Sequence, residues 1–98
     1  MRIIAKKALA DFWARHPEAE ERLATWFRVL SNCSAKNFSE LKRTFQTADY
    51  VPKKFTVFDV GGNAYRVVCV IHYNMQTAYI RGVHTHRDYD RWTEENRT

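Results

Sequence analysis

The chain has 98 residues, 45% hydrophobic and 14% aromatic, which suffices for one hydrophobic core but not two and excludes a disordered chain. Sixteen Lys or Arg against eleven Asp or Glu give a net charge of +5, which favours a polyanionic partner, most often nucleic acid, over a merely basic surface. No apolar run approaches the ~20 residues of a membrane-spanning helix, and the N-terminal residues lack a signal peptide's apolar stretch, so we expect a single cytoplasmic domain, 1–98, with no membrane partner.

The first half of the sequence predicts helices, after a short strand at 2–4. Apolar residues then recur at helical spacing, and this helix should end at His16, because the residue before a proline is disfavoured in helical geometry. Pro17 suits the first position of a second, antiparallel helix. A third, short helix should begin at Asn37, because Glu40 completes the spacing of a capping box and can reach back to the helix start.

The second half predicts an antiparallel meander and a short closing helix. The stretch Tyr50-Val51-Pro52-Lys53-Lys54 breaks any helix before the meander, and Gly61-Gly62-Asn63 is expected as a turn within it. Strands are expected at 55–60, 65–72 and 77–84, with Tyr65, Val67, Cys69 and Ile71 on one face of the second strand and Tyr79, Arg81 and Val83 on one face of the third. Thr85 can cap the closing helix, with Asp88 as the third residue. This order predicts an α+β fold, with the helices packed on one face of a small antiparallel sheet.

The stretch V-H-T-H-R-D-Y-D-R-W near the C-terminus gathers groups that carry chemistry, and it could be a solvated tail, a metal site or the active end of an enzyme. His86, Tyr89 and Asp90 fall at helical spacing on one face. A metal site built on His84, His86 and Asp88 is disfavoured, because Asp88 is better explained as a cap and the chain has no HExxH motif or cysteine cluster. We expect no metal and no cofactor.

Four segments in order carry a family resemblance: K-K-A-L-A-D-F-W-A-R-H-P-E-A-E, N-F-S-E-L-K, G-N-A-Y-R-V-V and Y-I-R-G-V-H-T-H-R-D-Y-D. Together they resemble the HigB family, the toxins of type II toxin–antitoxin systems. The resemblance implies a RelE-like fold and an mRNA interferase, an endoribonuclease that cuts messenger RNA, commonly on the ribosome. It also implies a cognate HigA-like helix-turn-helix antitoxin, with operator DNA bound only through their complex. Gly82 and His84 depart from the pattern, which usually has a bulky apolar residue and a glycine there.

Metal-independent RNA cleavage needs a base for the 2′-OH, an acid for the leaving 5′-oxygen and cations for the phosphorane. His86 is our first choice for acid or base, because imidazole titrates near neutrality; the alternative is an exposed histidine with no task. Arg66 and Arg81 occupy strand positions and could grip phosphate oxygens, or pair with a carboxylate such as Asp59. The resemblance places a phosphate-binding arginine at Arg66.

Two further residues of the closing helix have a catalytic and a structural interpretation. Tyr89 could stack on a splayed base or donate a proton, or it could pack the helix onto the sheet. Asp90 could orient His86, or form an ion pair with Arg87 or Arg91.

Basic residues crowd the stretch between the helices and the meander and would hold phosphates without reading sequence, although each could equally be a solvated side chain. The predicted RNA-binding residues are Lys7, Lys36, Lys42, Arg43, Lys53 and Lys54. An endoribonuclease toxin is the leading hypothesis, and a non-catalytic RNA-binding or antitoxin-binding module on the same fold is the alternative. A DNA-binding regulator is disfavoured, because the sequence shows no recognition-helix pair.

Overall fold

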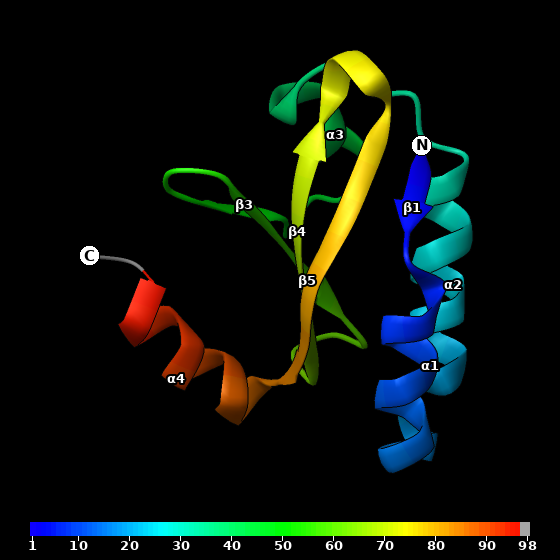
Figure 1. Cartoon of the computed structure of the whole chain (residues 1–98), viewed down its shortest axis with the longest axis vertical. Helices are drawn as coiled ribbons and strands as arrows, with labels where there is room; N and C mark the ends of the chain where they lie inside the picture. Colours follow the sequence, from blue (N-terminus) through cyan, green and yellow to red (C-terminus); the bar gives the residue numbers. More distant parts are fainter. Residues whose placement is uncertain (97–98) are drawn as a thin grey trace.

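The computed structural model describes residues 1–96 and contains a five-stranded sheet with helices on both faces (Figure 1). In chain order the elements are β1 (Arg2–Ile4), α1 (Lys6–Arg15), the 3-10 turn η1 (Pro17–Ala19), α2 (Glu20–Ser31), α3 (Phe38–Thr44), β2 (Asp49–Val51), β3 (Phe55–Val60), β4 (Tyr65–His72), the 3-10 turn η2 (Tyr73–Met75), β5 (Thr77–Thr85) and α4 (His86–Asn96). The strand order is β1-β5-β4-β3-β2, with β1 parallel to β5 and all other neighbours antiparallel. The predicted α+β class is confirmed.

The helices of the first half begin and end close to where the sequence predicts. Helix α1 ends before His16, and Pro17 opens η1, which leads into α2. Asn37 caps α3, since its Oδ1 accepts a hydrogen bond from the Glu40 N–H at 2.9 Å. The Glu40 carboxylate reaches back one residue further than a regular capping box, and accepts the Lys36 N–H at 2.9 Å.

The main core lies between the sheet and helices α1 and α2. Leu9, Leu23 and Leu30 are fully buried there against Val67 and Cys69 of β4. Figure 1 shows α1 and α2 side by side along one face of the sheet. Within residues 1–96, no helix is both long enough and apolar enough to cross a bilayer.

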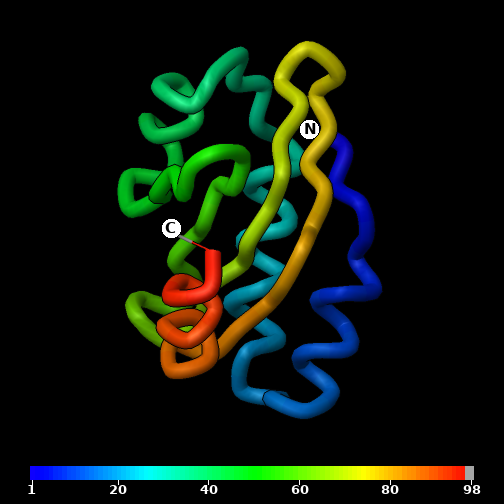
Figure 2. Tube along the Cα trace, turned by 60° about the vertical axis from the view of Figure 1, so that its left-hand side comes forward, coloured from blue at the N-terminus to red at the C-terminus, as the bar shows by residue number. Residues whose placement is uncertain are grey.

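The prediction that all helices pack on one face is wrong, because α4 covers the opposite face. A second, smaller core lies under α4, where Val51, Val57 and Val68 are buried against Tyr89 and Trp92. The reason is that β4 carries buried valines on both faces, Val67 on one and Val68 on the other, so each face needs a cover. Figure 2 shows α4, in red, against the lower part of the sheet only, while the yellow β4–β5 hairpin extends past it.

Strands β3 and β4 have the predicted bounds, but β2 was predicted only as a break in helical structure. Its three residues are too short to show a strand period, and they are extended because they pair with β3 in antiparallel register. Between β3 and β4 the predicted turn is present, with Gly61 and Gly62 at positive φ values of 68° and 69°. Such values are open to glycine at little cost.

Strand β5 contains a bulge that the sequence analysis missed. The register between β4 and β5 shifts by one residue, and Arg81 is the residue skipped. Because a bulge adds one residue to one strand, it interrupts the simple alternation of faces. Val83 packs against the main core, whereas Tyr79 pairs with Val70 on the α4 face. The prediction that Tyr79, Arg81 and Val83 share one face is therefore wrong.

Candidate active site

A hollow of about 550 Å³ lies between α4 and the strands β2, β3 and β4. Its floor is formed by β3 and β4 and its wall by one side of α4. The lining residues are Thr47, Asp49, Val57, Asp59, Arg66, Tyr89, Asp90, Thr93 and Glu94. One arginine therefore faces four carboxylates across this space.

Arg66 is only 7% exposed, and its guanidinium is held in the hollow by polar neighbours. Its Nε lies 3.0 Å from Oδ1 of Asp59, the directly paired residue on β3. Nη1 donates to the carbonyl of Tyr65 at 3.0 Å, and Nη2 donates to Oδ1 of Asn63 at 2.5 Å. A buried charge needs such partners, and their positions hold the guanidinium in one orientation. Arg66 therefore pairs with Asp59, which was one interpretation, and also lines the hollow.

His86 meets Arg66 at the start of α4. The Thr85 hydroxyl accepts the Asp88 N–H at 3.2 Å, so the predicted cap is confirmed and fixes where the helix begins. Nη2 of Arg66 lies 3.1 Å from Nδ1 of His86. Because a guanidinium only donates hydrogen bonds, Nδ1 is the acceptor, and a neutral His86 carries its proton on Nε2. That nitrogen lies 3.7 Å from Oδ2 of Asp90.

Tyr89 and Asp90 complete the group. The Arg66 guanidinium carbon lies 5.5 Å from the centre of the Tyr89 ring, which stacks on Trp92 with centroids 5.8 Å apart. Tyr89 therefore packs α4 onto the sheet and also lines the hollow. The carboxylate of Asp90 faces His86, as the orienting interpretation predicts. Of the five predicted catalytic residues, the structure brings together Arg66, His86, Tyr89 and Asp90.

Arg81 lies outside this group. It is exposed at the bulge of β5, and its guanidinium carbon is 5.5 Å from the centre of the Tyr79 ring. Its prediction as a catalytic residue rested on a strand position, which the bulge alters.

The predicted RNA-binding residues are spread over two sides of the molecule. Lys7 lies on α1, across the sheet from the hollow, and pairs with Asp11 at 2.7 Å. Lys42 donates to the carbonyl of Ala48 at 3.0 Å, close to β2. Lys54 lies beside the Phe55 ring on the α4 face, with Nζ 5.4 Å from the ring centre.

The other three, Lys36, Arg43 and Lys53, are exposed. Lys36 lies just before α3, Arg43 in its last turn, and Lys53 in the turn between β2 and β3. The structure thus does not gather the six into one surface.

The two departures from the family pattern form a matched pair. A Cβ at Gly82 would lie 2.6 Å from Nε2 of His84, so the imidazole occupies the space that a side chain at position 82 would need. Burial lowers the pKa of His84 below its ordinary value of 6.5, and the nearby Asp88 carboxylate partly opposes this. The ring also lies near Trp92, with centroids 6.3 Å apart.

The metal interpretation gains no support from the geometry. His84 turns Nε2 toward Gly82, whereas His86 contacts Arg66 and Asp90. In the part of the chain that the structure describes, residues 1–96, no group of three or more His, Cys, Asp or Glu side chains is placed to hold a metal ion.

Asn63 is the site residue that sequence reasoning missed. It was predicted only as part of a turn, yet its amide oxygen orients Arg66. The signal that could have found it is its position in a tight Gly-Gly-Asn turn, two residues before the strand that carries Arg66 begins. A polar side chain in that turn is close enough to accept a hydrogen bond from Arg66, three positions further along the hairpin.

Comparison with known proteins agrees with the resemblance. The model of the HigB toxin family, the RelE-like toxic component of a toxin–antitoxin system, matches residues 19–92. The chain is 36% identical over 101 aligned residues to the mRNA interferase toxin HigB of Escherichia coli strain K12, covering all of the chain and 96% of that protein. An mRNA interferase HigB of Shigella flexneri gives the same identity and coverage. One of E. coli O6:H1 strain CFT073 is 26% identical over 95% of the chain and 92% of its own length. The chain therefore belongs to the HigB family of RelE-like toxins.

Proposed function

We propose that this protein is an mRNA interferase, an endoribonuclease toxin that a cognate antitoxin neutralises. Membership of the HigB family and the mRNA interferase activity for which its relatives are named support this proposal. The single observation that carries it is the 3.1 Å contact between Nη2 of Arg66 and Nδ1 of His86 at the edge of the hollow. It sets a fixed cation beside a group that can accept a proton, and RNA cleavage by the 2′-OH needs both.

In the proposed reaction, the scissile phosphate enters the hollow and takes the Arg66 hydrogen bond that His86 holds in the free protein. A phosphate is a stronger acceptor for a guanidinium than an imidazole is, because both partners are then charged. Nδ1 of His86 is released and takes the proton of the 2′-OH, while Asp90 stabilises the imidazolium through Nε2.

The 2′-oxygen then bonds to phosphorus, and the bond from phosphorus to the 5′-oxygen breaks. Tyr89 is the candidate acid for that oxygen, because its ring lines the hollow beside Arg66. Arg66 neutralises the added charge of the phosphorane. The products are a 2′,3′-cyclic phosphate and a 5′-hydroxyl, and no metal ion takes part in the proposed step.

We propose further that cleavage takes place on the ribosome. The hollow sets Asp49, Asp59, Asp90 and Glu94 around a single arginine, and these carboxylates repel the phosphates of a free RNA strand. The site alone therefore attracts free RNA poorly. A ribosome that presents the message in a fixed path supplies the positioning that the hollow lacks.

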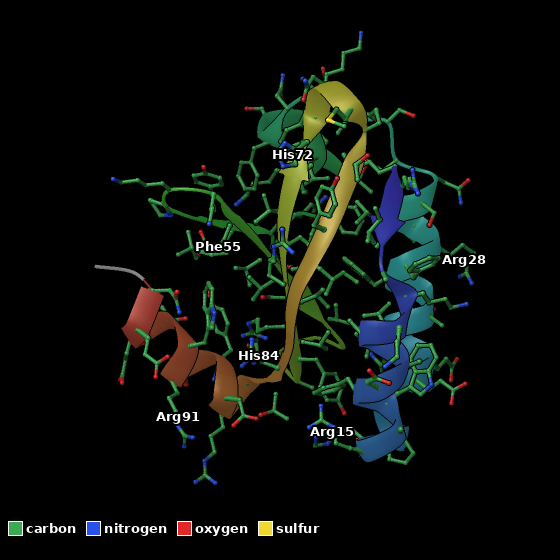
Figure 3. All side chains as sticks on the ribbon, viewed as in Figure 1. Arg15, Arg28, Phe55, His72, His84 and Arg91 are labelled. Atoms are coloured by element: carbon green, nitrogen blue, oxygen red, sulfur yellow. The ribbon has the colours of Figure 1, made fainter. Side chains whose placement is uncertain are left out.

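The test is cleavage of a defined message in a purified translation system, with the new ends mapped by primer extension. The proposal expects cleavage by the native protein and loss of it in His86→Ala and Arg66→Ala. Arg28→Ala is the matched control, since Figure 3 shows Arg28 on α2, across the sheet from α4. RNA binding without new 5′-hydroxyl ends would identify a non-catalytic module and overturn the proposal.

A further inference from the structure

We propose that the part of the sheet face between the edge of α4 and the β4–β5 hairpin is a subsite for the bases of single-stranded RNA on one side of the scissile linkage. We call the side chains Phe55, Val70 and Tyr79 the aromatic row, since two rings flank a valine. The inference rests on the proposed function, because it names where the substrate of that same site is held. It gives Tyr79 and Arg81 a role in binding rather than in the chemical step.

The strand register places the row on one face. Phe55 is the direct partner of Val70, and Val70 is the direct partner of Tyr79. Directly paired residues project to the same side of a sheet, and with strands ~4.8 Å apart the two rings are about 10 Å apart. That side is the α4 face, because the Phe55 ring meets the Trp92 ring edge-on at 5.1 Å. Figure 3 shows Phe55, His72 and His84 on this side and Arg15 and Arg28 on the other.

The row continues the candidate active site along the same strand. Arg66 and Val70 are four residues apart on β4, so they share a face at a separation of about 13 Å. Helix α4 covers the face near Arg66 and stops short of the hairpin, as Figures 1 and 2 agree. Phe55, Val70 and Tyr79 are half-buried, and His72 beside them is exposed. A strand whose phosphate lies at Arg66 can therefore reach the row with its neighbouring nucleotides.

Each ring of the row has a cation beside it. Nζ of Lys54 lies 5.4 Å from the centre of the Phe55 ring, and the guanidinium carbon of Arg81 lies 5.5 Å from that of Tyr79. His72 meets Tyr79 edge-on at 5.5 Å. Both cations are on exposed side chains, so each can pair with a phosphate while its ring stacks on a base. This pairing of an aromatic face with a nearby cation is how proteins hold single-stranded nucleic acid without reading its sequence.

The chemistry of this surface favours RNA over a protein partner. The two rings are separated by a valine and bordered by cations, so they form isolated stacking positions rather than a continuous apolar groove for a helix of an antitoxin. The neighbouring hollow is rimmed by carboxylates, so attraction for a polyanion must come from beside it. The bulge contributes to this surface, because it leaves Arg81 without a pairing partner on β4 and with its guanidinium over the Tyr79 ring.

The experiment measures the affinity of the full chain for a fluorescein-labelled, unstructured oligoribonucleotide by anisotropy, in a His86→Ala background that prevents cleavage. Tyr79→Ala should weaken binding about tenfold, the scale of one lost base stack, whereas Tyr79→Phe should stay close to the native ring. Arg81→Gln should weaken binding and reduce its salt dependence. Lys6→Gln is the matched control, because Lys6 makes the same contact with Phe27, 5.3 Å from the ring centre, on the opposite side of the sheet.

Ribosomal cleavage by the same variants in a His86 background separates this inference from the proposed function. Tyr79→Ala should raise KM and leave kcat near the native value, because the row binds RNA and takes no part in the chemistry. If the native protein cleaves and Tyr79→Ala binds RNA as well as Lys6→Gln does, the subsite is wrong while the proposed function stands. Weaker antitoxin binding with unchanged RNA binding would also overturn it, and so would the absence of any RNA binding at low salt. Native-like thermal melting of Tyr79→Phe and Arg81→Gln keeps folding defects apart from the subsite.

Discussion

Nη2 of Arg66 and Nδ1 of His86 lie 3.1 Å apart, although the two residues are separated by 20 positions and belong to β4 and α4. The guanidinium can only donate, so the contact decides which imidazole nitrogen is free of a proton. Arg66 is in turn held by Asp59 and Asn63. The orientation of the exposed histidine is therefore set by a buried arginine that its neighbours on the sheet hold in place.

Arg66→Lys is predicted to lower cleavage on the order of 100-fold with the fold intact. A lysine keeps the charge, but its single ammonium cannot bond Asp59, Asn63 and a phosphate in the geometry of the planar fork. Primer extension on the purified translation system measures the loss. Arg28→Lys, on an exposed helix position, should cleave like the native protein. Native activity in Arg66→Lys would show that a point charge is sufficient.

Arg66→Ala is predicted to lower stability as well, by about 3 kcal/mol, because removing one partner of a buried ion pair leaves the other without compensation. The carboxylate concerned is Asp59, whose side chain is 29% exposed. Urea unfolding followed by tryptophan fluorescence gives the free energy of unfolding. The double variant Arg66→Ala with Asp59→Ala should recover part of the loss. If the double variant loses the sum of the two single losses, the pair contributes nothing to stability.

His86→Ala is predicted to abolish detectable cleavage, a loss on the order of 100-fold or more, without changing the urea midpoint. The side chain is 48% exposed, so its removal leaves no cavity in the core. Asp90→Asn should lower cleavage less, because it retains a hydrogen-bonding partner for Nε2 while removing the charge that stabilises the imidazolium. Equal and complete losses in both variants would assign Asp90 a larger role than orientation.

Gly82→Ala is predicted to destabilise the protein by about 1–2 kcal/mol, the usual cost of overpacking. The added Cβ would lie 2.6 Å from Nε2 of His84, and the ring is packed near Trp92. The double variant Gly82→Ala with His84→Ala should lose less than the sum of the two single variants, since the first change fills space that the second vacates. A double-mutant cycle of unfolding free energies measures this coupling, and strict additivity would contradict it.

His84 is predicted to make stability depend on pH on the acidic side of neutrality. Its pKa is lower in the folded protein than the ordinary 6.5, so the unfolded chain binds the proton more tightly. Its contribution is therefore complete above pH 6.5 and is lost as the pH falls from there through the folded-state pKa. Urea midpoints between pH 8 and pH 5 measure the slope, and His84→Gln should flatten it. An equal slope in both proteins would assign the dependence to other groups.

Local signals in the sequence predicted the elements that depend on local physics. The caps at Asn37 and Thr85, the break at Pro17 and the strand bounds at 55–60 and 65–72 each follow from a few neighbouring residues. Arg66 and His86 were both predicted as site residues on chemical grounds, and their side chains lie 3.1 Å apart.

The remaining features depend on pairing between distant segments. Strand β2 exists because β3 is beside it, and α4 takes the second face because Val68 and Val57 need a cover there. The bulge at Arg81 changes the faces by a single residue, which no periodicity in β5 reveals. Asn63 belongs to the site because its side chain contacts Arg66, and a turn motif alone does not specify that contact.

The bulge also makes β5 one residue longer than its hydrogen-bonded partner requires. Deleting Arg81 would join Ile80 to Gly82 in unbroken register with β4, with every other side chain of the strand still facing its present side. The surplus residue is thus the one member of the strand whose identity the architecture leaves open. A substitution of Arg81 can therefore change what the protein binds without changing its fold.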